Sequence, residues 1–157
     1  MVFAAGASTI VGEPRQVTTM HDPDRRDPQE AIEALVRGPA VAVAENATLR
    51  AVAAALTRAG IGAALVRSTS GSIRIVSERD IARALALGGN PDNVWSADVA
   101  SAGLVTADAR DRILQVAFRM LDQNIRHIAI ERDDEIVGVV SSRDVFAVLA
   151  EHAVAML

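Results

Sequence analysis

Residues 40–86 of this chain recur without a gap at residues 104–150. A constant shift of 64 positions carries Ser77 onto Ser141 and Asp80 onto Asp144, and it aligns the apolar residues on either side. A repeat of this kind is a supersecondary unit that usually buries its apolar face against a neighbouring copy. We therefore expect two copies that pack as a pseudo-symmetric pair, with a cleft between them as the place for function.

The hydrophobic period changes in the same order in both copies. An amphipathic helix with apolar residues at i, i+3, i+4 and i+7 follows a first short strand, and a second helix follows two further strands joined by a hairpin turn. The strands are expected at 40–43, 62–66 and 73–76 in the first copy and at 104–106, 126–130 and 135–140 in the second. The unit is therefore β-α-β-β-α, and the fold class is α+β.

The chain divides into three parts. Residues 1–37 are expected to form an N-terminal arm and a short helix, which begins near Pro28, ends before Gly38 and docks on the first repeat. Residues 38–93 contain the first repeat and a linker rich in turn residues, and residues 94–157 contain the second. Trp95, the only tryptophan, is expected to anchor the linker against the repeat core.

Composition excludes several classes of function. The net charge of −4 and the lack of a basic stripe argue against binding to nucleic acid or to an anionic membrane. The absence of cysteine excludes disulfides and thiol chemistry and removes the commonest structural zinc ligand. No apolar run approaches the roughly 20 residues of a membrane span, and no signal peptide is read at the N-terminus. We expect a soluble, cytoplasmic protein.

The element order and one local motif resemble the CBS domain, which occurs as tandem pairs called Bateman modules. The family's glycine-hydrophobic-x-Ser/Thr-x-x-Asp signature matches residues 138–144 completely, and it matches 74–80 except that Arg74 replaces the glycine. The resemblance covers about residues 38–153. It implies two CBS repeats packed with pseudo-two-fold symmetry, and an adenosyl ligand such as AMP, ADP, ATP or S-adenosylmethionine bound between them.

The repeated Ser-x-x-Asp has two interpretations. At the start of a helix it is close to a capping box, in which serine and acid side chains satisfy free backbone amides. The same junction presents free amides and the positive end of the helix dipole, which suit an anion, while an ionised aspartate accepts hydrogen bonds from ribose hydroxyls. The resemblance implies the second role for Asp80 and Asp144, with Ser77 and Ser141 assisting.

The two half-sites differ in sequence. The second copy has Arg126 and His127 where related proteins place basic residues for phosphate, and the first copy has Gly62 and Ala63. Arg79 and Arg143 are either solvated residues or phosphate contacts, and His127 is either a ligand contact or a surface strand residue, with no metal site expected. The expected nucleotide-binding residues are Thr106, Arg126, His127, Gly138, Ser141, Arg143 and Asp144, and the expected weaker second site contains Ser77, Arg79 and Asp80.

The sequence and the resemblance together imply a stand-alone regulatory module. We expect it to bind an adenine nucleotide or S-adenosylmethionine as a regulatory ligand, without a cofactor, and to signal through an unidentified partner protein or through its own homodimer. The alternative is a structural dimerisation module with vestigial nucleotide sites. An enzyme is not expected, because the chain has no cysteine or lysine nucleophile and no recognisable Ser/His/Asp arrangement.

Overall fold

The computed structural model describes residues 25–157. The first repeat contains β1 (Ala42–Ala44), α1 (Leu49–Ala59), β2 (Ala63–Arg67), β3 (Ile73–Ser77) and α2 (Glu78–Ala86). The second contains β4 (Thr106–Asp108), α4 (Ile113–Asp122), β5 (His127–Arg132), β6 (Glu135–Ser141) and α5 (Ser142–Val154). Each repeat forms a three-stranded sheet in which the first pair of strands is parallel and the second is antiparallel. The expected β-α-β-β-α order is therefore confirmed in both copies.

The first strand of each repeat begins later than its sequence predicts. β1 starts at Ala42 and β4 at Thr106, two residues after the expected positions. Val41 and Val105 nevertheless pack against the two cores, and their carbonyls accept hydrogen bonds from Leu65 (2.9 Å) and Ala129 (3.2 Å). The apolar pattern therefore located the residues that are drawn into the core, and regular pairing begins only after them.

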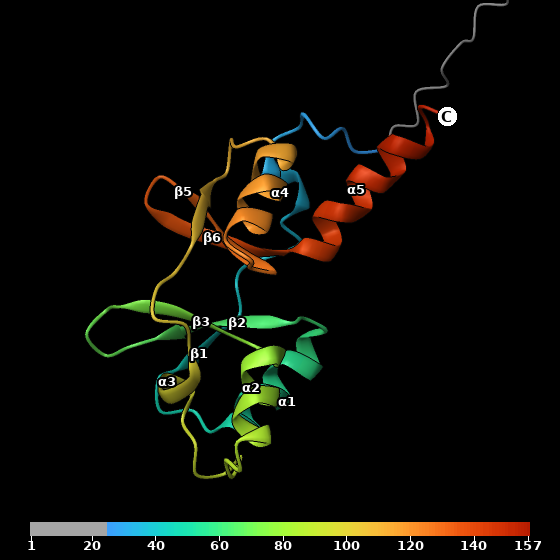
Figure 1. Ribbon diagram of the computed structural model, residues 1–157. Coiled ribbons are helices and arrows are strands. Elements are labelled where there is room, and N and C mark those ends of the chain that lie inside the picture. The colour runs from blue at the N-terminus through green and yellow to red at the C-terminus, as the bar shows by residue number, and fades with distance from the viewer. Residues whose placement is uncertain (1–24) are drawn as a thin grey trace, which may run out of the picture.

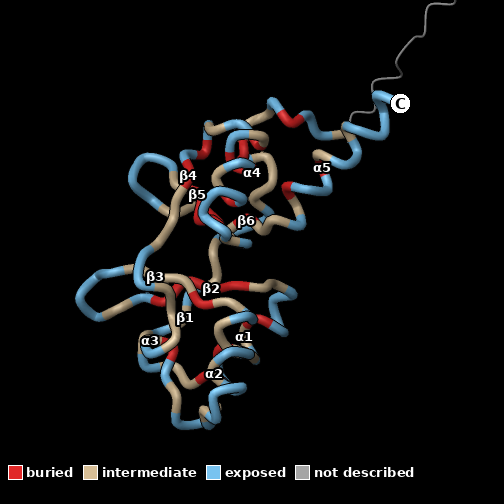
Figure 2. The backbone as a smooth tube through the Cα atoms, viewed as in Figure 1, coloured by how far each residue is buried: buried red, intermediate tan, exposed pale blue. Residues whose placement is uncertain are grey.

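The middle strand of each sheet is its most buried element. Residues 63–66 of β2 and 128–130 of β5 are all buried, as expected for a strand covered on both faces. Figure 1 shows the two sheets facing each other, with α1 and α2 on the far side of the first sheet, and Figure 2 shows the continuous buried stretch along β2. Within residues 25–157, no helix is long and apolar enough to cross a membrane.

The N-terminal segment packs on the second repeat, so the expectation that it docks on the first is wrong. It forms only a short 3-10 helix, η1 (Ile32–Leu35), in place of the expected longer helix. Ile32 is fully buried in the core of the second repeat, and its amide donates to the carbonyl of Asp111 at 2.7 Å. An ion pair joins Glu33 to Arg132 at the end of β5. The sequence pattern identified a buried face but not the partner that covers it.

The segment between the repeats makes the reciprocal contact with the first repeat. It contains a short helix that the sequence did not predict, α3 (Ser96–Val99). Ser96 is fully buried, and its hydroxyl donates to the carbonyls of Ala44 (2.7 Å) and Glu45 (2.9 Å). Trp95 remains 45% exposed, so the small serine and not the tryptophan anchors this segment. Each repeat is therefore completed by the segment that precedes the other one.

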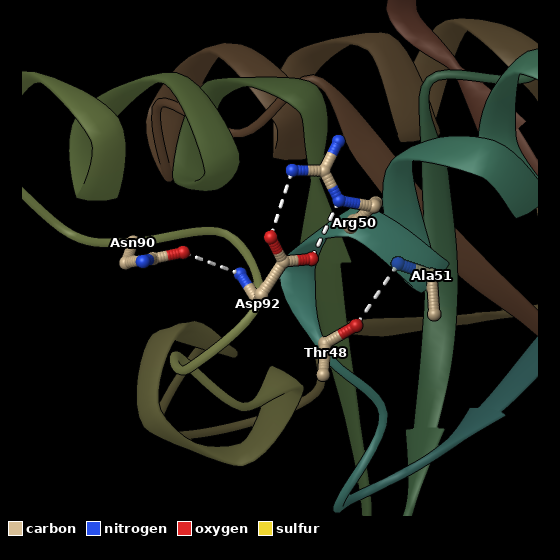
Figure 3. A network of polar contacts seen from close by, with 5 residues as sticks. All are labelled: Thr48, Arg50, Ala51, Asn90 and Asp92. Atoms are coloured by element: carbon tan, nitrogen blue, oxygen red, sulfur yellow. Dashed lines mark hydrogen bonds and ion pairs between the residues drawn. The ribbon is translucent and has the colours of Figure 1, made fainter.

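The linker is also attached to the start of α1. Thr48 caps this helix by accepting from the amide of Ala51 at 3.2 Å, and Arg50 forms a two-point contact with the carboxylate of Asp92 at 2.5 and 2.9 Å (Figure 3). Asn90 accepts from the amide of Asp92 and orders the turn (Figure 3). Hydrogen bonding to Arg50 lowers the pKa of Asp92. These contacts hold the linker against the first repeat before the chain enters the second.

Candidate functional site

A cleft of about 1010 Å³ lies between the two repeats. One wall comes from the first repeat and is mainly apolar, whereas the other comes from the second repeat and is polar. The apolar wall includes Val41, Leu56, Ile61 and Ala63, and the polar wall includes Arg126, His127, Ser141, Ser142, Arg143 and Asp144. An amphipathic ligand with one apolar part and one charged part fits such a pair of walls.

Asp144 is the central carboxylate of the polar wall. It stands at the third residue of α5, and its Oδ2 accepts a hydrogen bond of 2.6 Å from the Ser141 hydroxyl. The Asp144 amide donates to the same hydroxyl at 3.3 Å, so serine and acid do form a helix cap. The second oxygen, Oδ1, accepts from Arg37 Nη2 at 2.8 Å. Oδ2 of Asp144 therefore belongs to the helix cap, while Oδ1 is bonded to the exposed side chain of Arg37, which can move away.

The equivalent carboxylate of the first repeat is arranged differently. Both the amide and the hydroxyl of Ser77 donate to Oδ2 of Asp80, at 2.9 and 2.6 Å. The other oxygen of Asp80 lies 3.9 Å from Arg83, one turn further along α2. Neither Ser77, Arg79 nor Asp80 lines the cleft of about 1010 Å³. The structure therefore brings together the second copy of the motif, and it leaves the first copy as a local helix cap.

Three basic groups predicted from the sequence lie in the cleft. Arg126 and Arg143 are exposed and form no ion pair with any other residue in 25–157. His127 is partly buried at the start of β5, and this burial lowers its pKa below the ordinary value of 6.5. The imidazole is therefore neutral at physiological pH, and the two guanidinium groups supply the fixed positive charge of this wall.

Two charged residues of the cleft were not identified from the sequence. Arg37 lies in the segment between η1 and β1, and Glu78 begins α2. Under the shift of 64 positions their counterparts are Ser101 and Ser142, so no repeated pattern marks either charge. The charged residues that line the cleft are therefore three arginines, Arg37, Arg126 and Arg143, and two acids, Glu78 and Asp144.

Within the expected stronger site, Thr106 and Gly138 are the two residues that do not line the cleft. Thr106 lies on β4 and borders a separate hollow of about 490 Å³, whose other lining residues include Asp108 and Arg119. Gly138 faces the N-terminal segment, because an added Cβ would lie 2.4 Å from Cγ1 of Val36 and 3.3 Å from the carbonyl oxygen of Gly38. Gly138 therefore leaves room for the N-terminal segment that precedes the first repeat and packs on the second.

The same contact explains why the first repeat tolerates Arg74 in place of glycine. The shift of 64 positions pairs Val36 with Ala100. The larger side chain is therefore on the packed segment in the second repeat (Val36 against Gly138) and on the strand in the first repeat (Arg74 against Ala100). In the first repeat the amide of Ser101 donates to the carbonyl of Ile75 at 2.9 Å, which lays the segment along β3. Arg74 extends past it and donates to the carbonyl of Ala97 at 3.0 Å. The packed segment therefore requires a glycine at position 138 and does not require one at position 74.

Comparison with known proteins agrees with this architecture. The family model of the CBS domain matches twice, at residues 32–87 and 96–151. A stretch of 78 residues, 48% of this chain, is 30% identical to an uncharacterised protein of Methanopyrus kandleri and spans 40% of that protein's length. Both family matches begin within the short helix that precedes each repeat.

Solved structures share the same fold. A CBS domain protein from Pyrobaculum aerophilum, complexed with AMP, is 32% identical with a TM-score of 0.69, and the match covers 79% of this chain and 98% of that one. A CBS-domain protein from Agrobacterium tumefaciens is 21% identical with a TM-score of 0.70, covering 77% and 94%. The CBS domain pair of protein MJ0100, in complex with 5′-methylthioadenosine and S-adenosyl-L-methionine, is 21% identical with a TM-score of 0.66, covering 76% and 98%. With two matched repeats and an interposed cleft, the chain belongs to the CBS domain family.

Proposed function

We propose that this CBS pair is a regulatory module that binds one adenosyl ligand in the cleft between its repeats. The observation that carries the proposal is the pairing of walls. A carboxylate, two serines and two arginines face an apolar surface made by Val41, Leu56 and Ile61. The apolar wall suits an adenine ring, Asp144 suits ribose hydroxyls, and the arginines suit a charged tail.

The solved relatives support this ligand class. The Pyrobaculum aerophilum protein, at 32% identity, was solved with AMP. The cleft also fits one ligand better than two, because only the second Ser-x-x-Asp lines it. We propose that the bound ligand changes how the module contacts an unidentified partner protein, so that the protein acts in regulation and not in catalysis.

The proposal is tested by calorimetric titration of the parent, Asp144→Ala and Asp80→Ala with AMP, ATP and adenosine. We expect the parent to bind, and Asp144→Ala to lose about 1.5–3 kcal/mol of binding free energy, the scale of a hydrogen bond to a charged group. Asp80→Ala is the matched control, because it removes the same group from the same motif outside the cleft. Equal losses in the two variants, or no binding by the parent at millimolar concentration, contradict the proposal.

We also propose that the protein assembles as a homodimer. Apolar side chains are exposed on α4 and α5, where Phe118 is 64%, Leu121 is 61% and Phe146 is 41% exposed. Exposed large apolar groups on adjacent helices are typical of an interface. They also favour the alternative function, a structural dimerisation module. Light scattering together with the titration distinguishes the two, because that alternative predicts a dimer that binds no nucleotide.

A further inference from the structure

The carboxylate proposed to hold the ribose is already occupied by a side chain of the same chain. Oδ2 of Asp144 accepts from Ser141 and Oδ1 accepts from Arg37 at 2.8 Å. A ligand hydroxyl that approaches Oδ1 therefore competes with the guanidinium for this oxygen and can displace it. The displacement is inexpensive, because the Arg37 side chain is 84% exposed and exposed ion pairs contribute little.

The released Arg37 remains in the cleft. It belongs to an exposed segment, residues 37–39, which lines the same cavity as Arg126 and Arg143. Once it leaves Asp144, three guanidinium groups surround the ligand, and among residues 25–157 the only other acid of the cleft is Glu78. A phosphate gives Arg37 a new anionic partner with two-point geometry, whereas the uncharged 5′-hydroxyl of adenosine gives it none.

We infer that Arg37 determines the ligand specificity of the cleft by exchanging Asp144 for a ligand phosphate. Adenosine breaks the Arg37–Asp144 ion pair without replacing it, because its 5′-hydroxyl carries no charge. AMP and ATP break the same pair and form another. This inference rests on the proposed function, and it adds that the cleft selects phosphorylated nucleosides through a residue outside the repeated motif.

The test measures the affinities of AMP and adenosine in the parent, in Arg37→Ala and in Arg67→Ala. Arg37→Ala should bind adenosine about two- to fivefold more tightly, because an exposed ion pair no longer competes for Asp144. The same variant should bind AMP about fivefold or more weakly, because one charge-assisted contact to phosphate is lost. Arg67 is an exposed arginine at the opposite end of β2 from the cleft, and its removal should change neither affinity.

The opposite signs separate this exchange from other roles of Arg37. A loss of AMP affinity without a gain for adenosine would show that Arg37 contacts phosphate without guarding Asp144, and it would overturn the inference. Shifts in the same direction for both ligands would overturn it as well, and so would no shift at all. The proposed function survives all three results, since none of them changes whether the parent binds or whether Asp144→Ala and Asp80→Ala differ.

Discussion

His127 of the second repeat lies against the first repeat inside the cleft. A Cβ added to Gly62 of the first repeat would lie 2.8 Å from its Nε2, so the ring rests against the neighbouring backbone. Burial is the main reason for its lowered pKa, and the charges of Arg126 and Arg79 act in the same direction. Glu78 and Asp144 oppose this effect by favouring the protonated ring. Burial against Gly62 outweighs the two carboxylates, so the folded protein prefers the neutral imidazole.

This preference predicts a loss of stability in mild acid. Since the pKa of His127 is lower in the folded state than in the unfolded state, the unfolded chain takes up the proton first. The contribution of the neutral ring is fully present above about pH 6.5 and is lost as the pH falls toward the folded-state value. We expect the melting temperature of the parent to fall between about pH 7.5 and 5.5 by more than that of His127→Gln, which cannot titrate.

Thermal melts of both proteins over this pH range measure the difference. Carboxylates that titrate near the lower limit affect both proteins alike, so the comparison isolates the histidine. Parallel curves for the parent and for His127→Gln would show that protonation of this ring does not oppose folding.

The residues of the cleft that the sequence identified all belong to the second repeat's motif or to the start of its middle strand. Ser141, Arg143 and Asp144 follow from the motif, and Arg126 and His127 follow from the resemblance, which places basic residues for phosphate at the start of the middle strand. Neither the motif nor the resemblance marks Arg37 or Glu78, because Arg37 lies before the first strand and Glu78 is at a variable position of the motif. Their role depends on the distance between segments far apart in sequence, such as Arg37 and Asp144, which no local pattern contains.

The arrangement of whole elements was predictable to the level of the single repeat. Alternating and helical periods gave the strands and long helices, because each element buries one face within its own repeat. The packing of η1 and α3 was not predictable, since a short apolar segment such as Ile32–Leu35 fits either core by composition alone. The choice of core for each segment follows the size of the residue that the segment packs against. Gly138 in the second repeat leaves room for Val36, whereas Arg74 in the first repeat faces the segment that contains the smaller Ala100.

This packing predicts that Gly138→Ala destabilises the protein and that Val36→Ala relieves the effect. The added methyl group would overlap Cγ1 of Val36, and overpacking of this kind costs about 1–3 kcal/mol of unfolding free energy. In the double variant the Cγ atoms of Val36 are absent. Gly138→Ala should therefore lower the unfolding free energy less in the Val36→Ala background than in the parent. Urea unfolding of the four proteins forms a double-mutant cycle that measures the coupling.

The same cycle separates packing from ligand binding at Gly138. If Gly138 is needed only for packing against the N-terminal segment, the double variant should bind AMP as the parent does. A neutral Gly138→Ala, or strictly additive changes in unfolding free energy, would contradict the packing role. Loss of AMP binding in a stably folded double variant would instead return Gly138 to the ligand site.

At the scale of the whole molecule, the reciprocal segments make each repeat depend on chain outside its own sequence unit. The core of the second repeat contains Ile32, and the first repeat is closed by Ser96, Val99 and Ala100. The first described residue also contacts the last helix, because Arg25 donates to the carbonyls of Glu151 and His152 near the end of α5. The cleft lies between the repeats, so its two walls depend on the packing of both.

Two fragments of similar length test this dependence. A fragment of residues 25–89 keeps Ile32 without its core and lacks α3, so we expect it to be unfolded or aggregated. A fragment of residues 40–101 omits η1 and includes α3, so the hydrogen bonds of Ser96 and the packing of Val99 are retained. Both are small enough that single domains of their size are marginal, and so a few contacts decide between folded and unfolded states.

We therefore expect circular dichroism to show more helix and a higher melting temperature for residues 40–101 than for residues 25–89. The reason is that the fragment of residues 40–101 contains Ser96, Val99 and Ala100, which pack against the first repeat and are absent from residues 25–89. A cooperative melt from residues 25–89 would contradict the prediction, since that result would mean that the first repeat folds without α3. In that case the exchange of segments would fix the relative position of the repeats without being needed for the stability of either one.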